Sequence, residues 1–369
     1  MNHKAFASKL YYRLCCCLFF FVAAAASFNG YYDKWRLLDT TQDGLLRGRN
    51  TFEPMMDGTA ERPFVYRQLL PMLANFGDRQ ISELTKDRLF SENRHIGLLR
   101  IVLQINSPVT QDRAYFLRYW IIYGLDFLFA WGAVYAMYLL GKSAGFAAPT
   151  AAASAVLMIL LIPYFMNMGG YFYDYPELAF LALTAWMALS FDWWWMIPVV
   201  ALAALNKESF LFFIPTLYPL LRQRSSRINA LVGTGVLGLI CAAVYCALRV
   251  RFQLNPGVTA ENNILQQFQF MLHLQNWVFP QKMYGTVFLP IYNPLSLALI
   301  AWTLWRCWRS LPRAIQRHMQ IAAIINFPLF LLFGFPGEVR GLSLLYVTLL
   351  LLLAASLTEW TSGQTRTST

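Results

Sequence analysis

Charged residues are scarce in this sequence, and acidic residues are the scarcer kind. Only 13% of the 369 residues are charged, and 19 acidic residues stand against 30 basic ones. Hydrophobic residues reach 57%, and apolar stretches of spanning length recur along the chain. Short alternating strands are missing, which argues against a β-barrel. This composition excludes an ordinary soluble domain and predicts an all-α, polytopic integral membrane protein.

Cysteine and histidine provide neither a disulfide framework nor a metal-ligand pattern. The six Cys lie in or beside apolar runs, at Cys15, Cys16, Cys17, Cys241, Cys246 and Cys307. The four His are scattered, at His3, His95, His273 and His318. We therefore expect the Cys to pack as small hydrophobic side chains. The residues indicate no metal ligands and no particular cofactor, although carboxylates could hold a divalent cation.

Ser/Gly-rich linkers and internal repeats are also missing, which predicts a single membrane domain over residues 1–369. The net charge of +11 does not indicate nucleic-acid binding, because many Lys and Arg flank apolar runs. At such positions they orient a membrane protein and contact anionic lipids.

The stretch Trp193–Leu221 decides the predicted topology. It is apolar except for Asn206–Ser209, which contains Lys207 and Glu208. If the chain turns back there, Lys142 and the basic residues at 222–227 share one face, in agreement with the positive-inside tendency. We therefore predict a broken re-entrant hairpin whose tip points to the non-cytoplasmic side. The alternative is a continuous helix in which a snorkelling Lys207 pairs with Glu208.

The other apolar runs complete a total of about nine or ten membrane segments. Spans are expected at about residues 14–27, 115–140, 146–166, 178–190, 229–248, 286–305, 319–334 and 341–358. The first is expected to be a retained signal-anchor, with a cleaved signal peptide as the alternative. Asp126 lies inside the second, where it either packs between helices or serves a cavity.

Two long segments are placed on the non-cytoplasmic side. Residues 31–113 follow the first span and are expected to include interfacial helices at 79–90 and 93–105. Residues 251–285 form a second segment that is rich in amides and aromatics. Such a mixture suits sugar binding and also suits any polar lid.

The predicted topology gathers charged and aromatic residues near one non-cytoplasmic rim. They are Asp33, Tyr66, Arg67, Asp174, Glu177, Lys207, Glu208, Glu338 and Arg340. Carboxylates can act as general bases, and Arg and Lys bind phosphate. The combination is typical of transfer from a lipid-linked phosphate donor to a hydroxyl group. The alternatives are helix capping by Asp174 and Glu177, and plain salt bridges for the cation–acid pairs.

This arrangement resembles the GT-C superfamily of polytopic glycosyltransferases, which use polyprenyl-phosphate-linked sugars. Members place an acidic residue just after the first span and follow it with a long outer segment. The resemblance implies that Asp33 is the catalytic base, with Asp39 and Asp43 as near substitutes. The chain has no Asp-Asp or Glu-x-Asp pair after the first span.

On this interpretation, the other rim residues divide the remaining roles. Arg67, Lys207 and Arg340 bind the phosphate, Glu208 and Glu338 orient these cations, and Tyr66 contributes to substrate binding. Asp174 and Glu177 line the acceptor or metal site. The expected reaction transfers a sugar to an envelope glycan or lipid acceptor, on the periplasmic side of a bacterial inner membrane. An endoplasmic-reticulum membrane is the alternative location.

Three other functions stay open. A polysaccharide polymerase or ligase acting on lipid-linked repeats would depend on outer-loop Arg residues rather than on one base. A transporter or flippase predicts inverted repeats with paired broken helices. A non-catalytic scaffold of an envelope-assembly complex would tolerate neutralisation of Asp174, Lys207 and Arg340.

Overall fold

The computed structural model describes residues 14–31, 52–95, 109, 112–167, 169–258, 262–284 and 286–362. About 79% of these residues are helical. Among them, the two strands β1 (Gln281–Met283) and β2 (Thr286–Phe288) pair antiparallel, with Lys282 opposite Val287. The predicted all-α class agrees with this content.

Five of the described helices are long and apolar enough to cross a membrane. They are Leu14–Tyr31, α6 (Arg113–Ser143), α7 (Ala148–Phe165), α11 (Arg227–Arg251) and the Val339–Thr361 stretch, which joins η6 (Val339–Leu345) to α15 (Tyr346–Ser362). These helices are compatible with a multi-pass membrane protein. The predicted total of nine or ten segments stays a prediction.

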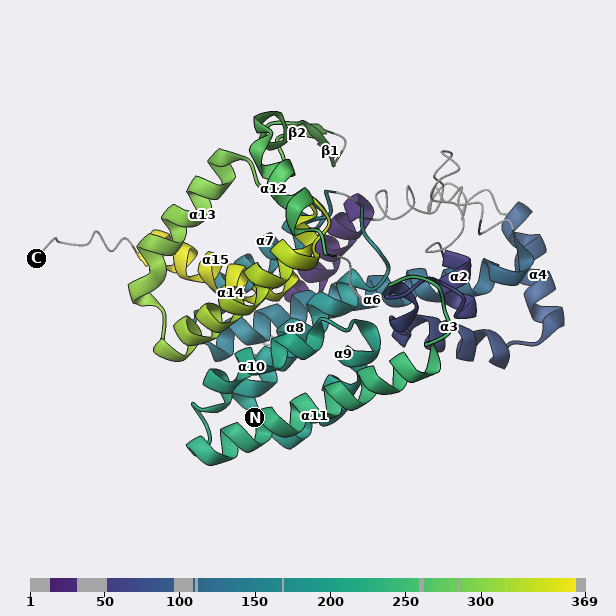
Figure 1. Ribbon diagram of the computed structural model, residues 1–369, viewed down its shortest axis with the longest axis horizontal. Helices are drawn as coiled ribbons and strands as arrows, with labels where there is room; N and C mark the ends of the chain where they lie inside the picture. Colours follow the sequence, from purple (N-terminus) through teal and green to yellow (C-terminus); the bar gives the residue numbers. More distant parts are fainter. Residues whose placement is uncertain are drawn as a thin grey trace, which may run out of the picture.

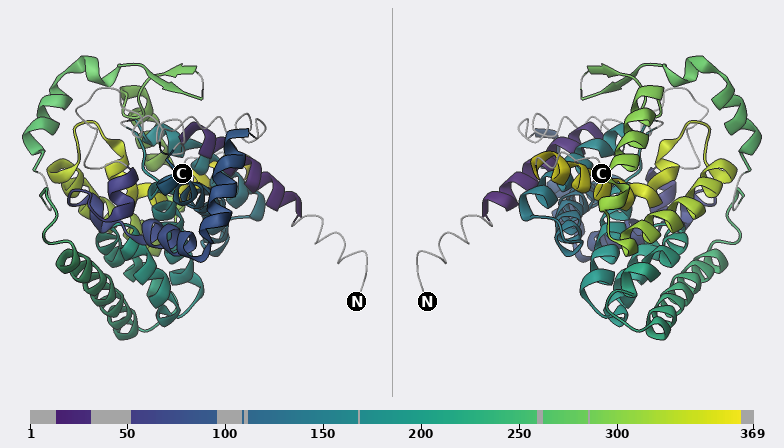
Figure 2. Two further views of the ribbon diagram at one scale, coloured as in Figure 1. Left: turned by 90° about the vertical axis from the view of Figure 1, so that its right-hand side faces the viewer. Right: turned by 90° about the vertical axis from the view of Figure 1, so that its left-hand side faces the viewer.

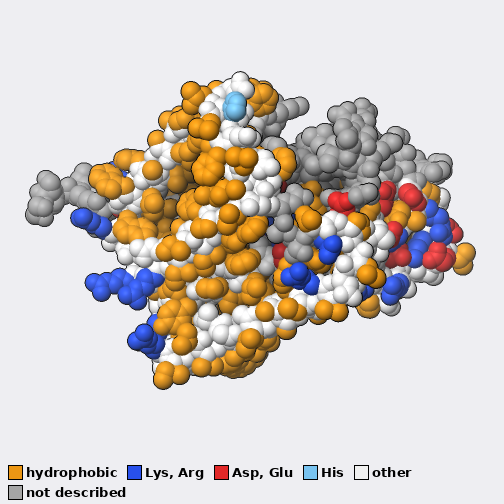
Figure 3. Space-filling view, viewed as in Figure 1, with side chains coloured by type: hydrophobic (Ala, Val, Ile, Leu, Met, Phe, Trp, Pro, Cys, Tyr) orange, Lys and Arg blue, Asp and Glu red, His pale blue; other side chains and the backbone are white. Residues whose placement is uncertain are grey.

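The long helices run between two ends of the molecule (Figure 1). At one end, Ser190 receives a hydrogen bond from Arg224 and contacts Ser143, and Arg306 pairs with Glu359 at 2.9 Å. We call this the basic end, after its Lys142, Arg222, Arg224, Arg227, Arg306, Arg309, Arg313 and Arg317. Figure 3 shows Lys and Arg side chains without acidic neighbours at its left edge, and both acidic and basic side chains toward the right.

The stretch that decides the topology folds back on itself. The helix α8 (Asp174–Ser190) leads through η3 (Trp193–Met196) into α9 (Ile197–Asn206), and α10 (Phe210–Leu221) follows. Trp193 donates to Asn229 at the start of α11, and Arg224, just after α10, donates to Ser190. Both ends of the α9–α10 unit therefore lie at the basic end. The chain reverses at the intervening residues, as the sequence predicts, instead of continuing as one helix.

The described residues 52–95 of the first long segment, which we call the outer segment after its predicted position, pack on the N-terminal end of α6. With 31 residues, α6 is about 46 Å long at 1.5 Å per residue, well beyond a hydrocarbon core of about 30 Å. Its first turns bind the outer segment, because Arg113 pairs with Glu83 and Asp87, and Arg118 pairs with Asp57 at 3.1 Å. This segment contains α2 (Phe52–Asp57), η1 (Phe64–Tyr66), α3 (Leu69–Gln80) and α4 (Glu83–His95).

The predicted helix at 79–90 is wrong in its boundaries, because the chain breaks at Ile81 and Ser82 instead of near residue 91. Ser82 accepts a hydrogen bond from the Thr85 backbone N–H, and so opens the new helix in the way that serine favours. Most of the predicted helix at 93–105 lies outside the described residues.

The predicted span at 286–305 also begins too early. Residues 286–288 belong to β2, and the helix α13 begins at Pro294 and ends at Cys307. Asn293 sets this boundary, since its side chain accepts from the Ser296 N–H and Pro294 follows in the first helical turn. The second outer segment, with α12 (Ile264–Leu272) and η4 (Leu274–Trp277), therefore extends past residue 285.

Small residues allow the central helices to approach closely. Ala130, Ala133, Ala182, Ala185 and Ala188 of α6 and α8 are all fully buried, which is the usual way for membrane helices to pack. After η5 (Trp308–Ser310), α14 (Arg313–Phe333) packs on α10 through His318, which contacts the Thr216 carbonyl. Figure 2 shows α11 and the β1–β2 hairpin at opposite margins of the molecule.

Thiol labelling tests the reversal at Lys207–Ser209. In a background without the six native Cys, Asp192→Cys and Gln223→Cys flank the α9–α10 unit and are both exposed. A membrane-impermeant reagent is expected to reach both from the same face of sealed vesicles. Gln253→Cys, which follows α11, is expected to react from the other face. Labelling of positions 192 and 223 from opposite faces would contradict the hairpin.

Candidate functional site

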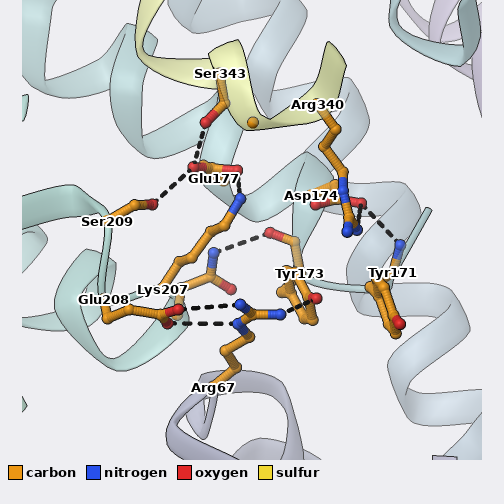
Figure 4. A network of polar contacts seen from close by, with 12 residues as sticks. Arg67, Tyr171, Tyr173, Asp174, Glu177, Lys207, Glu208, Ser209, Arg340 and Ser343 are labelled. Atoms are coloured by element: carbon orange, nitrogen blue, oxygen red, sulfur yellow. Dashed lines mark hydrogen bonds and ion pairs between the residues drawn. The ribbon is translucent and has the colours of Figure 1, made fainter. Parts of the chain in front are cut away.

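Four separate segments bring charged residues together at the end opposite the basic one, which we call the cluster end (Figure 4). Arg67 follows η1, and Arg340 lies in η6. The start of α8 supplies two acids, where free N–H groups and the helix dipole favour negative charge. The break between α9 and α10 supplies the remaining cation and another acid.

Arg67 joins the outer segment to the hairpin. Its Nη2 and Nε donate to Glu208 Oε1 and Oε2 at 3.0 and 3.4 Å, which is the fork geometry of a bidentate pair. Its Nη1 donates to the Tyr173 hydroxyl, and the guanidinium lies 4.4 Å from the centre of the Tyr173 ring. A backbone bond from Gln68 to the Leu205 carbonyl, at 2.8 Å, reinforces the junction.

The Arg67–Glu208 pair is electrostatically favourable although it is largely buried. Burial alone would raise the pKa of Glu208, but the Arg67 guanidinium outweighs this effect and holds that pKa below its ordinary value. For Arg67, burial acts to lower the pKa, and Glu208 reverses the effect so that the pKa is raised. Both groups are therefore charged near neutral pH.

Lys207 pairs with Glu177 instead of with its neighbour Glu208. Its Nζ donates to Glu177 Oε2 at 2.6 Å. Glu177 Oε1 accepts from Ser343 at 2.8 Å and from Ser209 at 3.2 Å. The Glu177 side chain is 3% exposed and has three donors, so it is a fully satisfied buried carboxylate.

Arg340 pairs with two carboxylates. Its Nη1 donates to Asp174 Oδ2 at 3.2 Å, and its Nη2 donates to Glu338. Asp174 Oδ2 also accepts from the Tyr171 backbone N–H at 2.7 Å.

Stacked tyrosines connect the two guanidiniums. The Tyr171 and Tyr173 rings are nearly parallel, with centroids 5.1 Å apart. Arg340 lies 4.7 Å from the Tyr171 ring centre, and Arg67 lies over Tyr173. The Asn206 side chain donates to the Tyr173 carbonyl at 2.9 Å and so fixes this loop against the hairpin.

The structure therefore brings together seven of the nine rim residues named from the sequence: Arg67, Asp174, Glu177, Lys207, Glu208, Glu338 and Arg340. Tyr66 is buried one residue before Arg67, but its ring packs edge-on against Tyr245 of α11. Its predicted part in substrate binding stays a prediction. Asp33, with its near substitutes Asp39 and Asp43, lies outside the described residues.

Sequence reasoning did not assign roles to Tyr171, Tyr173, Asn206, Ser209 and Ser343. The signal that could have found the first two is the pair Gly169 and Gly170 before them, which indicates a turn. The Asp174 N–H donates to the Tyr171 carbonyl at 3.0 Å, and in this turn the Tyr171 and Tyr173 rings stack.

A metal centre receives no support from the described residues, among which no group of three or more His, Cys, Asp and Glu side chains could hold an ion. A separate hollow of about 350 Å³ lies between α6 and α8 and is lined by apolar side chains such as Phe129 and Phe180. None of the residues that line this hollow belongs to the charged cluster.

Comparison with known proteins leaves the family open. No family model matches the chain, and no curated protein or solved structure is significantly similar to it.

Removal of one member of a buried pair tests the stability of the cluster. Glu177→Gln leaves Lys207 without a counter-ion and is expected to lower the free energy of unfolding by about 3–5 kcal/mol. Thermal unfolding of the full chain in lipid nanodiscs measures the change. The control is Glu83→Gln, because Glu83 is 67% exposed in its pair with Lys86, so little change is expected. Equal effects of the two variants would contradict a buried, fully satisfied Glu177.

The Arg67–Glu208 pair also predicts a dependence of stability on pH. Because the pKa of Glu208 is lowered in the folded protein, its contribution is fully present above the ordinary glutamate pKa. The contribution is lost as the pH falls through the lowered, folded-state pKa. Wild type is therefore expected to lose more stability than Glu208→Gln between neutral and strongly acidic pH. Parallel pH profiles of unfolding for the two proteins would refute this linkage.

Proposed function

We propose that this protein is a membrane glycosyltransferase that moves a sugar from a polyprenyl-phosphate donor to a glycan or lipid hydroxyl. One observation carries the proposal: Arg67, Lys207 and Arg340 converge around Tyr173, each beside a carboxylate. Two guanidinium forks and one ammonium group match the leaving phosphate of such a donor. The resemblance to the GT-C arrangement points in the same direction.

The two Arg have exchangeable partners at the edge of the cluster. The Glu208 and Glu338 side chains are 22% and 20% exposed, whereas those of Asp174 and Glu177 are 0% and 3% exposed. A donor phosphate can therefore replace the two outer carboxylates as partner of Arg67 and Arg340. The inner acids keep Arg340 and Lys207 in place during the exchange.

The transfer step follows from this arrangement. The acceptor hydroxyl gives its proton to a carboxylate and attacks the anomeric carbon. The bond from that carbon to the phosphate oxygen breaks, and the polyprenyl phosphate leaves with the electron pair. The cations stabilise the charge that develops on the leaving oxygen. Asp33 is the proposed base. Phosphate binding would also release the carboxylates of Glu208 and Glu338 from Arg67 and Arg340.

The positive-inside tendency orients the molecule in this proposal. The basic end faces the cytoplasm, so the cluster end faces the periplasm of a bacterial inner membrane. The polyprenyl donor then reaches the cluster from the surrounding lipid, and the acceptor approaches from the aqueous side.

Substitution of the cluster arginines tests the proposal. Arg67→Gln and Arg340→Gln are each expected to reduce sugar transfer by roughly 100-fold or more, since each removes a donor to the developing charge. Arg67→Lys should recover part of the rate, because it keeps the charge without the fork. The assay follows release of polyprenyl phosphate from labelled donor by the full chain in nanodiscs.

The matched control is Arg118→Gln, which removes a cation that pairs with Asp57 at the same end but outside the cluster. It should leave transfer near the wild-type rate. Asp33→Ala separates the reaction classes: loss with Arg67→Ala but not with Asp33→Ala would favour a polymerase or ligase. Wild-type protein that transfers sugar from none of a panel of polyprenyl-phosphate donors would overturn the proposal.

A further inference from the structure

A carboxylic acid lies in the fully buried face of α6. Tyr119, Ile122, Asp126, Ala130 and Ala133 follow the helical repeat, and each is 0% exposed. Among the residues that the structure describes, neither carboxylate oxygen of Asp126 has a hydrogen-bond partner. No ion pair within this part of the chain includes Asp126 either. An acidic side chain without partners at such a position requires an explanation.

The groups around Asp126 provide no positive charge to balance it. Asp174 of α8 interacts with it electrostatically and has the same sign of charge. Tyr31 and Tyr175 lie close to both acids, with their ring centroids 4.5 Å apart. Both hydroxyls are engaged elsewhere, since that of Tyr31 donates to the Tyr171 carbonyl and that of Tyr175 contacts Ser27 at 2.7 Å.

One of the two carboxylate oxygens of Asp174 also lacks a hydrogen-bond partner among the described residues. Its Oδ2 accepts from Arg340 and from the Tyr171 N–H, whereas its Oδ1 is buried and has no partner among the described residues. Three orphan carboxylate oxygens therefore belong to two neighbouring acids. Of these two acids, Asp174 pairs with Arg340, whereas Asp126 has no cation partner among the described residues.

The cluster and Asp126 together contain more carboxylates than cations. Three cations, Arg67, Lys207 and Arg340, stand against the carboxylates of Asp126, Asp174, Glu177, Glu208 and Glu338. Glu208 and Glu338 reach the rim, where water can solvate them. Asp126 cannot do so, and an isolated buried charge costs several kcal/mol. The like charge of Asp174 adds to this cost, and a buried acid avoids both costs when it holds a proton.

We propose that Asp126 is a proton-binding site, which holds a neutral carboxylic acid near Asp174, beneath the charged cluster. A consequence, which rests on the proposed function, concerns donor binding. A neutral Asp126 leaves Arg340 as the counter-ion of Asp174 alone, so this inner pair stays in place when a phosphate replaces Glu338 as the outer partner of Arg340.

Infrared spectroscopy of the full chain in nanodiscs tests the proton site directly. Wild type at neutral pH is expected to show the C=O stretch of a protonated carboxylic acid, and the band should shift in D₂O. Asp126→Asn should lack this band and keep wild-type thermal stability, because Asn resembles the neutral acid in size. The control Asp192→Asn changes an exposed acid at the basic end and should retain the band.

A spectrum in which Asp126→Asn still shows the full band, or in which wild type shows none, would overturn the assignment. A large loss of stability in Asp126→Asn would do so as well, since it would indicate an ionised, paired Asp126. If that variant does not fold, Asp126→Leu removes the carboxyl group without adding a polar one. The measurement needs no donor, so its failure and the failure of sugar transfer are separate outcomes.

Discussion

Charge pairing at low dielectric is the constraint on which the cluster end depends. An ion buried between membrane helices is tolerated when a counter-ion and hydrogen bonds accompany it. Arg67 meets this condition through Glu208, 141 residues further along the chain, and Arg340 does so through Asp174, 166 residues before it. These pairs therefore tie the outer segment, α8, the α9–α10 unit and η6 into one arrangement. The tyrosine stack between the guanidiniums adds packing that is insensitive to the exact position of either charge.

The reversal between α9 and α10 follows from the same constraint. Lys207, Glu208 and Ser209 could not lie in the middle of a lipid-exposed helix without leaving charges unpaired. At the tip of a hairpin they meet partners from other segments, and the Asn206 side chain satisfies the Tyr173 carbonyl. The two halves are too short to cross a bilayer singly. A pair of short helices with a charged turn can therefore lie within a membrane only if protein surrounds the turn.

Hydropathy and the distribution of Lys and Arg were sufficient to predict most helices, the reversal and the gathering of seven rim residues. The sequence did not predict which residues of the cluster pair with each other. Lys207 has an extended backbone, with φ −157° and ψ 131°, so successive side chains point to opposite sides. Adjacent Lys207 and Glu208 therefore cannot pair with each other, and each turns to a residue that is distant in the sequence. Likewise, the early end predicted for the outer segment at 285 failed because a short hairpin and the Asn293 cap outweighed apolar content.

The cluster is best understood as two layers with different duties. The inner layer, Asp174 and Glu177, is buried and bonded to donors from η6 and from the break between α9 and α10, so an exchange of partners there would dismantle the fold. The outer layer, Glu208 and Glu338, is partly exposed and bonds guanidiniums that also keep aromatic contacts when a carboxylate leaves. A site that must accept an anion and later release it requires this division. Cations fixed by a rigid inner layer retain their geometry while their outer partners change, which is the preorganisation that electrostatic catalysis depends on.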